Sequence, residues 1–158
     1  MKRLPFLVFA LLFGATVWAG PIQEQNKALA RRVFDDIFNQ NKFEVAQEIY
    51  APDFVNHGLH RSVGLQEDQA AARGWKGAFP DGKMEVVLMV AENDLVTVVW
   101  TGTGTNTGQG NGLPATGKKV ELRGITVWRI ADGKIHEEWS AFDELRMMQQ
   151  LGLIPETK

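Results

Sequence analysis

The sequence predicts an α+β domain in which a curved, cone-shaped antiparallel sheet wraps around N-terminal helices, with a short C-terminal helix. Apolar side chains recur at helical spacing from residue 27 to residue 79, whereas β-branched and aromatic runs separated by short turns follow from residue 83. Helices gathered before a meander of strands are typical of this class. With 158 residues and 44% hydrophobic content, the chain can bury one sizeable core. The helices should cover one sheet face and leave a pocket between the two layers.

Three helices are expected in the first half of the chain. Residues 27–39 form an amphipathic pattern, residues 43–50 form a second short helix that Pro52 stops, and residues 64–79 form a third. The apolar positions of the first are Leu29, Val33, Phe34, Ile37 and Phe38, and those of the third are Leu65, Ala72, Trp75 and Phe79. The intervening residues 53–57 are too few for more than a small strand or a bend.

Four long strands are expected in the second half, over residues 84–91, 95–103, 120–130 and 134–142. Residues 104–117 form a loop rich in Gly, Asn and Thr, which is either a long hairpin tip or a flap over a pocket. No internal repeat or second domain is apparent.

The last strand and the closing helix meet at Asp143. A turn at Asp132 and Gly133 launches a strand in which side chains alternate between two faces. Strict alternation puts Ile135, Glu137, Trp139, Ala141 and Asp143 on one face, and His136, Glu138, Ser140 and Phe142 on the other. After Asp143 the apolar residues recur at helical spacing until Gly152 ends the helix.

Asp143 therefore has two interpretations, which the local pattern leaves open. A carboxylate beside aromatic residues can be tuned as a general acid or base, and Trp139 on the same strand face could form an indole wall next to it. The same residue can equally be a simple N-cap of the closing helix.

Residues 1–19 have the pattern of a secretory signal, with Lys2 and Arg3 before an apolar stretch and a small residue at Val17 and at Ala19. The mature domain would then be residues 20–158, periplasmic or secreted. Removal of Lys2 and Arg3 from the 17 basic residues leaves 15 against 19 acidic residues, a net charge of −4. This balance argues against nucleic acid or an anionic membrane as a partner. The chain has no cysteine, which excludes disulfides, thiolate chemistry and Cys-bound metal.

Several local strings resemble the SnoaL-like polyketide cyclases of the nuclear-transport-factor-2-like superfamily. They are residues 50–57 (YAPDFVNH), 79–82 (FPDG), 132–135 (DGKI) with Trp139, and Phe142-Asp143 with Leu151-Gly152, so the resemblance covers nearly the whole mature chain. It implies a cone-shaped α+β barrel with an apolar pocket and cofactor-free aldol ring closure. The matching position for the catalytic acid/base is Asp143, and the pocket asparagine of the family matches Asn56, with His57 beside it.

The chain departs from this family on the strand 120–130, where it has Arg123 and no histidine. Arg123 could hold a substrate carbonyl or carboxylate if it points inward, or be a solvated strand charge if it points outward. His57, His60 and His136 lack the spacing of a metal site, so no metal and no cofactor are expected. The export signal is a second departure, since polyketide tailoring is normally cytoplasmic.

Two function classes follow from this reading. The first is an acid/base enzyme, a cyclase or a related isomerase or hydrolase, acting on a small apolar carbonyl compound with Asp143 as the catalytic residue and Asn56, His57, Trp139 and Arg123 in contact with substrate. The second is a non-catalytic periplasmic protein that holds a small apolar ligand in the same fold. In either case we expect a homo-oligomer formed through the exposed face of the sheet.

Overall fold

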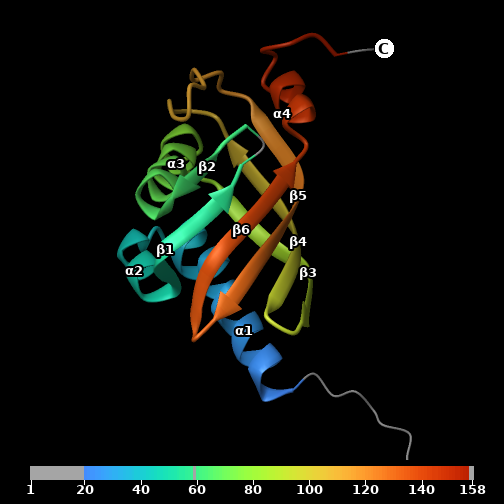
Figure 1. The fold of residues 1–158 in the computed structure, drawn as a ribbon. Coiled ribbons are helices and arrows are strands. Elements are labelled where there is room, and N and C mark those ends of the chain that lie inside the picture. Colours follow the sequence, from blue (N-terminus) through green and yellow to red (C-terminus); the bar gives the residue numbers. More distant parts are fainter. Residues whose placement is uncertain (1–19, 59, 157–158) are drawn as a thin grey trace, which may run out of the picture.

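The fold was obtained as a computed structural model, which describes residues 20–58 and 60–156 (Figure 1). The signal expected at residues 1–19 lies outside the described residues. Four α-helices and a six-stranded curved sheet make up the domain, so the α+β class is confirmed. No helix of the described residues is long and apolar enough to cross a membrane.

The first helix, α1 (Pro21–Arg32), continues without a break into a π-helical segment, η1 (Val33–Asn39). Together they form the amphipathic helix expected from the sequence. Val33, Phe34 and Ile37 are buried against the sheet. A π-helical segment is wider than an α-helix and often marks a functional position, and here it presents the aromatic side chains of Phe34 and Phe38 to a cavity.

The next segment differs from the expected bend. After a short helical turn η2 (Phe43–Val45) and helix α2 (Ala46–Ile49), strand β1 runs over Tyr50–His57. It pairs in antiparallel fashion with β2 (Ser62–Gly64) and in parallel fashion with β6. The sheet is therefore mixed, which corrects the expectation of a wholly antiparallel sheet. A local pattern cannot specify this pairing, because β1 and β6 are far apart in the sequence.

The remaining elements follow the expected order. Helix α3 (Leu65–Ala78) precedes β3 (Lys83–Glu92), β4 (Leu95–Thr105), β5 (Lys119–Ala131), β6 (Lys134–Phe142) and helix α4 (Glu144–Gln150). The strand order is β2-β1-β6-β5-β4-β3. In Figure 1 helix α1 lies behind the strands and α3 lies beside β1 and β2, while the face of β5 and β6 toward the viewer is uncovered.

Two hydrophobic clusters hold the layers together. The larger one joins α1, η1 and α2 to the inner face of the sheet, with Phe34, Ile37, Val98 and Trp128 among its members. The smaller one surrounds α4, where Met147 and Leu151 pack near Ala78, Phe79 and Leu113. Buried apolar area of this kind is the main stabilising contribution in a domain without disulfides.

The loop between β4 and β5 is fastened to α3. Asn106 is fully buried, its Nδ2 donates to the carbonyl oxygen of Ala78 at 3.1 Å, and its Oδ1 accepts from the backbone N–H of Thr116 at 2.8 Å. The backbones touch so closely that a Cβ atom on Gly110 would lie 1.9 Å from the carbonyl oxygen of Gly74. Of the two alternatives left open by the sequence, this arrangement favours a docked hairpin tip over a flap.

Strand β6 contains a β-bulge at His136. Arg129 of β5 pairs with Glu137, whereas the next residue, Ile130, pairs with Ile135, so His136 is an extra residue on β6. Ile135 is completely buried, but the bulge lets both His136 and Glu137 lie outside the core.

The bulge changes which side chains face inward for the rest of the strand. Glu138, Ser140 and Phe142 line the inner cavity, whereas Trp139 packs against the outer side. The prediction that Ile135 shares one face with Glu137 and Trp139 is therefore wrong, because strict alternation does not hold across an inserted residue.

Candidate active site

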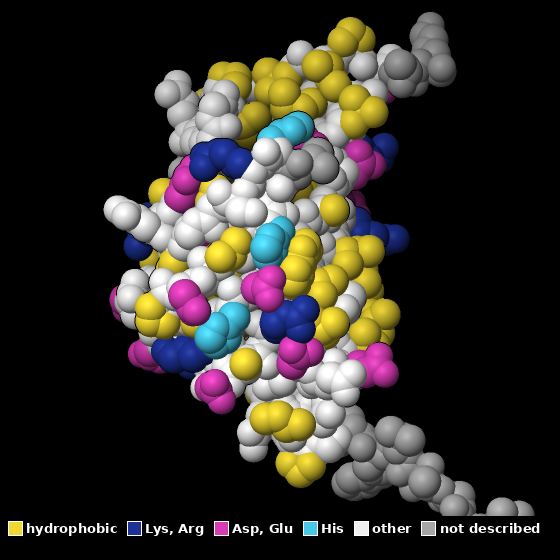
Figure 2. Space-filling view, viewed as in Figure 1, with side chains coloured by type: hydrophobic (Ala, Val, Ile, Leu, Met, Phe, Trp, Pro, Cys, Tyr) yellow, Lys and Arg dark blue, Asp and Glu magenta, His cyan; other side chains and the backbone are white. Residues whose placement is uncertain are grey.

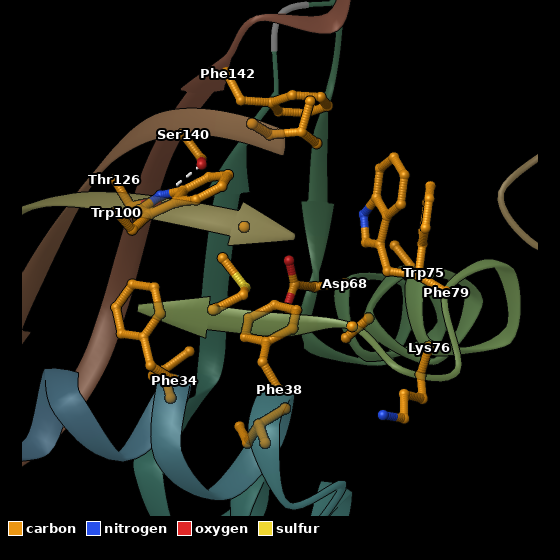
Figure 3. Close-up of a pocket in the computed structure, with 18 of the residues that line it drawn as sticks. Phe34, Phe38, Asp68, Trp75, Lys76, Phe79, Trp100, Thr126, Ser140 and Phe142 are labelled. Atoms are coloured by element: carbon orange, nitrogen blue, oxygen red, sulfur yellow. Dashed lines mark hydrogen bonds between the residues drawn. The ribbon is translucent and has the colours of Figure 1, made fainter. Parts of the chain in front are cut away.

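A cavity of about 330 Å³ lies between the helices and the inner face of the sheet. Its wall is mostly apolar and aromatic (Figure 3), with Phe34, Phe38, Trp75, Phe79, Trp100 and Phe142 around it. Such a concave, apolar site with a few convergent polar groups is typical of small-molecule binding.

Two carboxyl groups from distant parts of the chain meet in this cavity. Asp68 of α3 and Glu138 of β6 both line it, and the side-chain amide of Asn56 on β1 lies between them. Asn56 Nδ2 donates to Asp68 Oδ1 at 2.8 Å and to Glu138 Oε1 at 3.3 Å. The second oxygen of Glu138 accepts from Trp128 Nε1 at 2.7 Å. In Figure 3 the Asp68 carboxyl stands among the aromatic side chains.

Burial raises the pKa of Glu138 to about 8, and the nearby charge of Asp68 adds to this effect against the hydrogen bond from Trp128. Burial also raises the pKa of Asp68, although hydrogen bonds from Asn56 and Gln69 oppose the shift. Both side chains keep some accessible surface, but this surface faces the cavity they line. Since the charge of Asp68 is a cause of the Glu138 shift, Asp68 ionises first and Glu138 holds its proton near neutral pH.

Other polar side chains complete this end of the cavity. Trp100 Nε1 donates to Thr126 Oγ1 at 3.0 Å, and the Thr126 hydroxyl lies 2.9 Å from Ser140 Oγ. The phenol of Tyr50 is buried nearby, and burial together with the charges of Glu138 and Asp68 raises its pKa well above the ordinary value. This hydroxyl therefore keeps its proton and can act as a neutral hydrogen-bond donor or acceptor.

Local structure explains how the two carboxyl groups arrive at one place. Asp68 lies on the same side of α3 as Ala72 and Trp75, because residues four and seven positions apart share a helix face. Glu138 faces inward because of the bulge at His136. The pair is thus produced by helix periodicity on one side and by a strand irregularity on the other.

The structure brings only one of the predicted site residues into the cavity. Asn56 lines it, as expected, while its contact with a substrate stays a prediction. His57 instead stacks on Trp139 on the outer side, with ring centroids 4.7 Å apart, and its Nε2 lies 2.7 Å from Glu137 Oε2. The expected placement of His57 and Trp139 in the pocket is wrong, because the bulge turns Trp139 and Glu137 outward.

Asp143 and Arg123 also lie outside the cavity wall. Asp143 is exposed and caps α4, where its Oδ1 accepts from the backbone N–H of Arg146 at 2.9 Å. Its expected place in a dry aromatic pocket is wrong, since the cap requires the carboxylate at the exposed helix end. Arg123 is exposed on the outer face, which corresponds to the solvated alternative rather than the substrate-contacting one.

Sequence reasoning missed Asp68, and it placed Glu138 on a strand face without giving it a role in the site. The signal for Asp68 was present, since an acidic residue interrupts the apolar stripe formed by Leu65, Ala72 and Trp75. Glu138 gave no comparable signal, because the bulge that turns it inward depends on pairing with β5.

The arrangement supplies one ionised carboxylate and one protonated carboxyl group inside an apolar cavity. This combination can remove a proton from an activated carbon and deliver a proton to an oxygen. Among the described residues, no group of three or more His, Asp or Glu side chains is positioned to hold a metal ion.

Comparison with known proteins agrees with this fold. The family model of SnoaL-like polyketide cyclases matches residues 28–151. A candidate SnoaL-like polyketide cyclase from Jannaschia sp. CCS1 superposes with a TM-score of 0.79 at 26% identity, covering 86% of this chain and 97% of that one. AclR, a candidate hydroxylase from Streptomyces galilaeus, gives 0.78 at 26% identity with 86% of each chain covered.

IdmH, a candidate polyketide cyclase from Streptomyces antibioticus, gives a TM-score of 0.71 at 26% identity and covers 81% of this chain and 99% of that one. None of the curated proteins matches the chain. The similarity to these solved structures therefore extends over most of the described domain.

Proposed function

Because the chain belongs to the SnoaL-like polyketide cyclase family, we propose that it is a cofactor-free acid/base catalyst acting on a small apolar carbonyl compound. The observation that carries this proposal is the Asp68–Glu138 pair, linked by Asn56 inside an aromatic cavity. Intramolecular aldol closure, isomerisation and hydrolysis all draw on this chemistry, and the closure is described below.

The ionised Asp68 takes a proton from the carbon next to a carbonyl group, which leaves an enolate. The enolate carbon then forms a carbon–carbon bond to a second carbonyl carbon of the same molecule, and the oxygen formed there takes the proton of Glu138. Asp68 is now protonated and Glu138 ionised, so proton transfer between the two carboxyl groups restores the starting state. No atom is gained or lost, and no oxidant is needed.

Asp68 and Glu138 thereby take the acid/base role that the family resemblance implied for Asp143. The reason is position, since Asp143 caps an exposed helix end whereas a general acid or base must reach the reacting atoms. Catalysis by Asp143 stays a prediction that its variants can test.

The test uses 2-tetralone, an apolar ketone, and follows deuterium incorporation beside its carbonyl group in D2O by NMR. We expect Asp68→Asn and Glu138→Gln to slow the protein-dependent exchange by about 10²–10⁴-fold, the usual loss when a general acid or base is removed. Glu137→Gln is the matched control on the neighbouring outer position and should change the rate less than about twofold. Equal rates for wild type and Glu138→Gln would contradict the proposal.

A second candidate is a non-catalytic periplasmic protein that holds a small apolar ligand. The residue pattern at 1–19, which would direct export, favours it. In such a protein the Asp68–Glu138 pair would only bind the ligand. Apolar ligands would then bind, but the protein would not catalyse deuterium exchange of 2-tetralone. Mass spectrometry of the mature protein, with an N-terminus at Gly20, would support the export on which this candidate depends.

We further propose that two copies associate through the uncovered face of the sheet. Val87, Leu88, Val90 and Ile125 are apolar, and 49–60% of each is exposed there. Figure 2 shows apolar surface gathered over this side of the sheet. Exposed apolar patches of this kind often mark interfaces. Leu88→Arg combined with Ile125→Arg should yield monomers in light scattering, and a monomeric wild-type protein would contradict the association.

A further inference from the structure

Gln69 is the one cavity-lining side chain with a buried polar atom that lacks a partner among the described residues. Only 6% of this residue is exposed, it lies on α3 beside Asp68, and it lines the cavity. Its Nε2 donates to Asp68 Oδ2 at 3.2 Å, whereas no donor of the described residues lies within hydrogen-bond distance of its Oε1. Reversing the amide would place its oxygen against the ionised Asp68 carboxylate, so the orientation with Oε1 free is the favourable one.

An unpaired buried acceptor is costly unless something inside the site donates to it. The side-chain N–H groups of three other wall residues already donate elsewhere. Asn56 serves Asp68 and Glu138, Trp128 serves Glu138, and Trp100 serves Thr126. The Tyr50 hydroxyl and the Trp75 indole also line the cavity, but neither donates to Gln69 Oε1.

The two carboxyl groups of the cavity also lack a cationic partner among the described residues. Neither Asp68 nor Glu138 forms an ion pair with a Lys, Arg or His of the described residues. Lys76 lines the cavity, but in Figure 3 its ammonium group points away from the aromatic side chains. A donor group on a ligand therefore competes with no cation of the described residues for these two carboxyl groups.

We propose that the cavity selects ligands that carry a hydrogen-bond donor on an apolar body, with Gln69 Oε1 receiving that donor beside the carboxyl pair. Gln69 is then a specificity-determining residue. The donor can be a hydroxyl group or an ammonium group, and both meet the same acceptor. This inference rests on the proposed function in that both place the ligand in one cavity, but it concerns which molecule is accepted rather than which reaction occurs.

Three naphthalene derivatives of similar size test the inference: 2-naphthalenemethanol, 2-naphthalenemethylamine and 2-(methoxymethyl)naphthalene, whose ether has no donor. Their binding is followed by the fluorescence of Trp75, Trp100 and Trp128, which line the cavity, and by calorimetry. We expect at least one donor-bearing ligand to bind wild type at least about tenfold more tightly than the ether. Comparison of the affinities for the alcohol and the amine shows whether a hydroxyl or an ammonium donor is preferred.

Gln69→Met keeps the shape of the side chain and removes the acceptor. In this variant the preference should fall to less than about twofold, with the ether bound as well as or better than in wild type. Gln66→Met, an exposed position on the same helix outside the cavity wall, is the matched control and should keep the wild-type preference. If Gln69→Met does not fold, the wild-type comparison still decides.

Equal affinity for all three ligands in wild type would overturn the inference while leaving an apolar binding cavity in place. A preference that survives in Gln69→Met would also overturn it. Failure of the catalytic proposal has a different signature, namely undiminished deuterium exchange in Glu138→Gln. Absence of binding for all three ligands would contradict both.

Discussion

Glu137 and Glu138 are neighbours on β6, but they lie on opposite faces of the sheet and have opposite surroundings. On the outer face, Glu137 accepts from His57 and from Arg129 Nε at 2.8 Å, and these hydrogen bonds lower its pKa below the ordinary value. On the inner face, burial raises the pKa of Glu138 to about 8. One residue type thus gives a solvated ion pair on one side and a proton-holding acid on the other.

The outer face also carries a network of ion pairs centred on Arg129. Arg129 pairs with Glu137 and, through Nη1 at 2.6 Å, with Asp94, and its guanidinium lies 5.9 Å from the Trp139 ring centroid. These groups satisfy one another in solvent, where such pairs contribute little to stability. No cation of the described residues pairs with the inner carboxyl groups, Asp68 and Glu138. This environment favours a role in proton transfer over a role in stabilising the fold.

The largest expected effect concerns the bulge that separates the two faces. Deleting Trp139 should turn Ser140 and Phe142 outward, because a one-residue shift reverses every later side chain. We expect loss of 2-naphthalenemethanol binding by on the order of 10²-fold or more, or failure to fold. Deleting His136, the extra residue of the bulge, leaves the pairing of Glu137 with Arg129 possible and should preserve binding despite a stability cost of about 1–3 kcal/mol. Equal damage by the two deletions would contradict this account of the bulge.

A second effect is the pH dependence of stability. Between pH 4.5 and pH 8 the folded state keeps the Glu138 proton that the unfolded state releases, so the free energy of unfolding should fall as pH rises, by on the order of 1 kcal/mol per pH unit. Glu138→Gln removes this slope, and its stability relative to wild type should therefore increase from pH 5 to pH 8 in denaturant titrations. Glu137→Gln should run parallel to wild type over this range, because lowering its pKa moves its titration to more acidic pH. Parallel curves for Glu138→Gln and wild type would show that Glu138 titrates normally.

The smallest effect is expected at Asp143. Asparagine caps helices about as well as aspartate, so Asp143→Asn should change stability by well under 1 kcal/mol, whereas Asp143→Ala should cost about 1 kcal/mol. Neither should change the exchange rate of 2-tetralone by more than about twofold, since the side chain caps an exposed helix end. A large loss of activity in Asp143→Asn would return the catalytic role to this residue.

Much of the fold could be predicted from the sequence because the signals were local. One such signal is the helical spacing of Val33, Phe34 and Ile37, which predicts a helix by itself. Another is the turn at Asp132 and Gly133, whose φ angles are 50° and 70° and which predicts a hairpin. The parallel pairing of β1 with β6 was not predictable, because nothing near either strand encodes a partner so distant in the sequence.

The site was less predictable because it depends on strand pairing, which a local pattern does not specify. Asn56 was placed correctly through a family resemblance, and Asp68 could have been noticed as a polar interruption of an apolar stripe. Trp139 and His57 were misplaced because alternation was extended from the buried Ile135 through a bulge that only the pairing with β5 defines. The cap at Asp143 was one of two alternatives, and the geometry of α4 favours it.

The most direct test of the central claim is the titration of the Glu137 and Glu138 side-chain carboxyls by NMR on selectively ¹³C-labelled protein, assigned with Glu137→Gln and Glu138→Gln. Opposite environments predict that Glu138 titrates near pH 8, whereas Glu137 titrates below its ordinary value of 4.5. Two overlapping titrations near the ordinary value would contradict the account, since Glu138 would then be ionised at neutral pH and could not serve as the proton donor of the cavity.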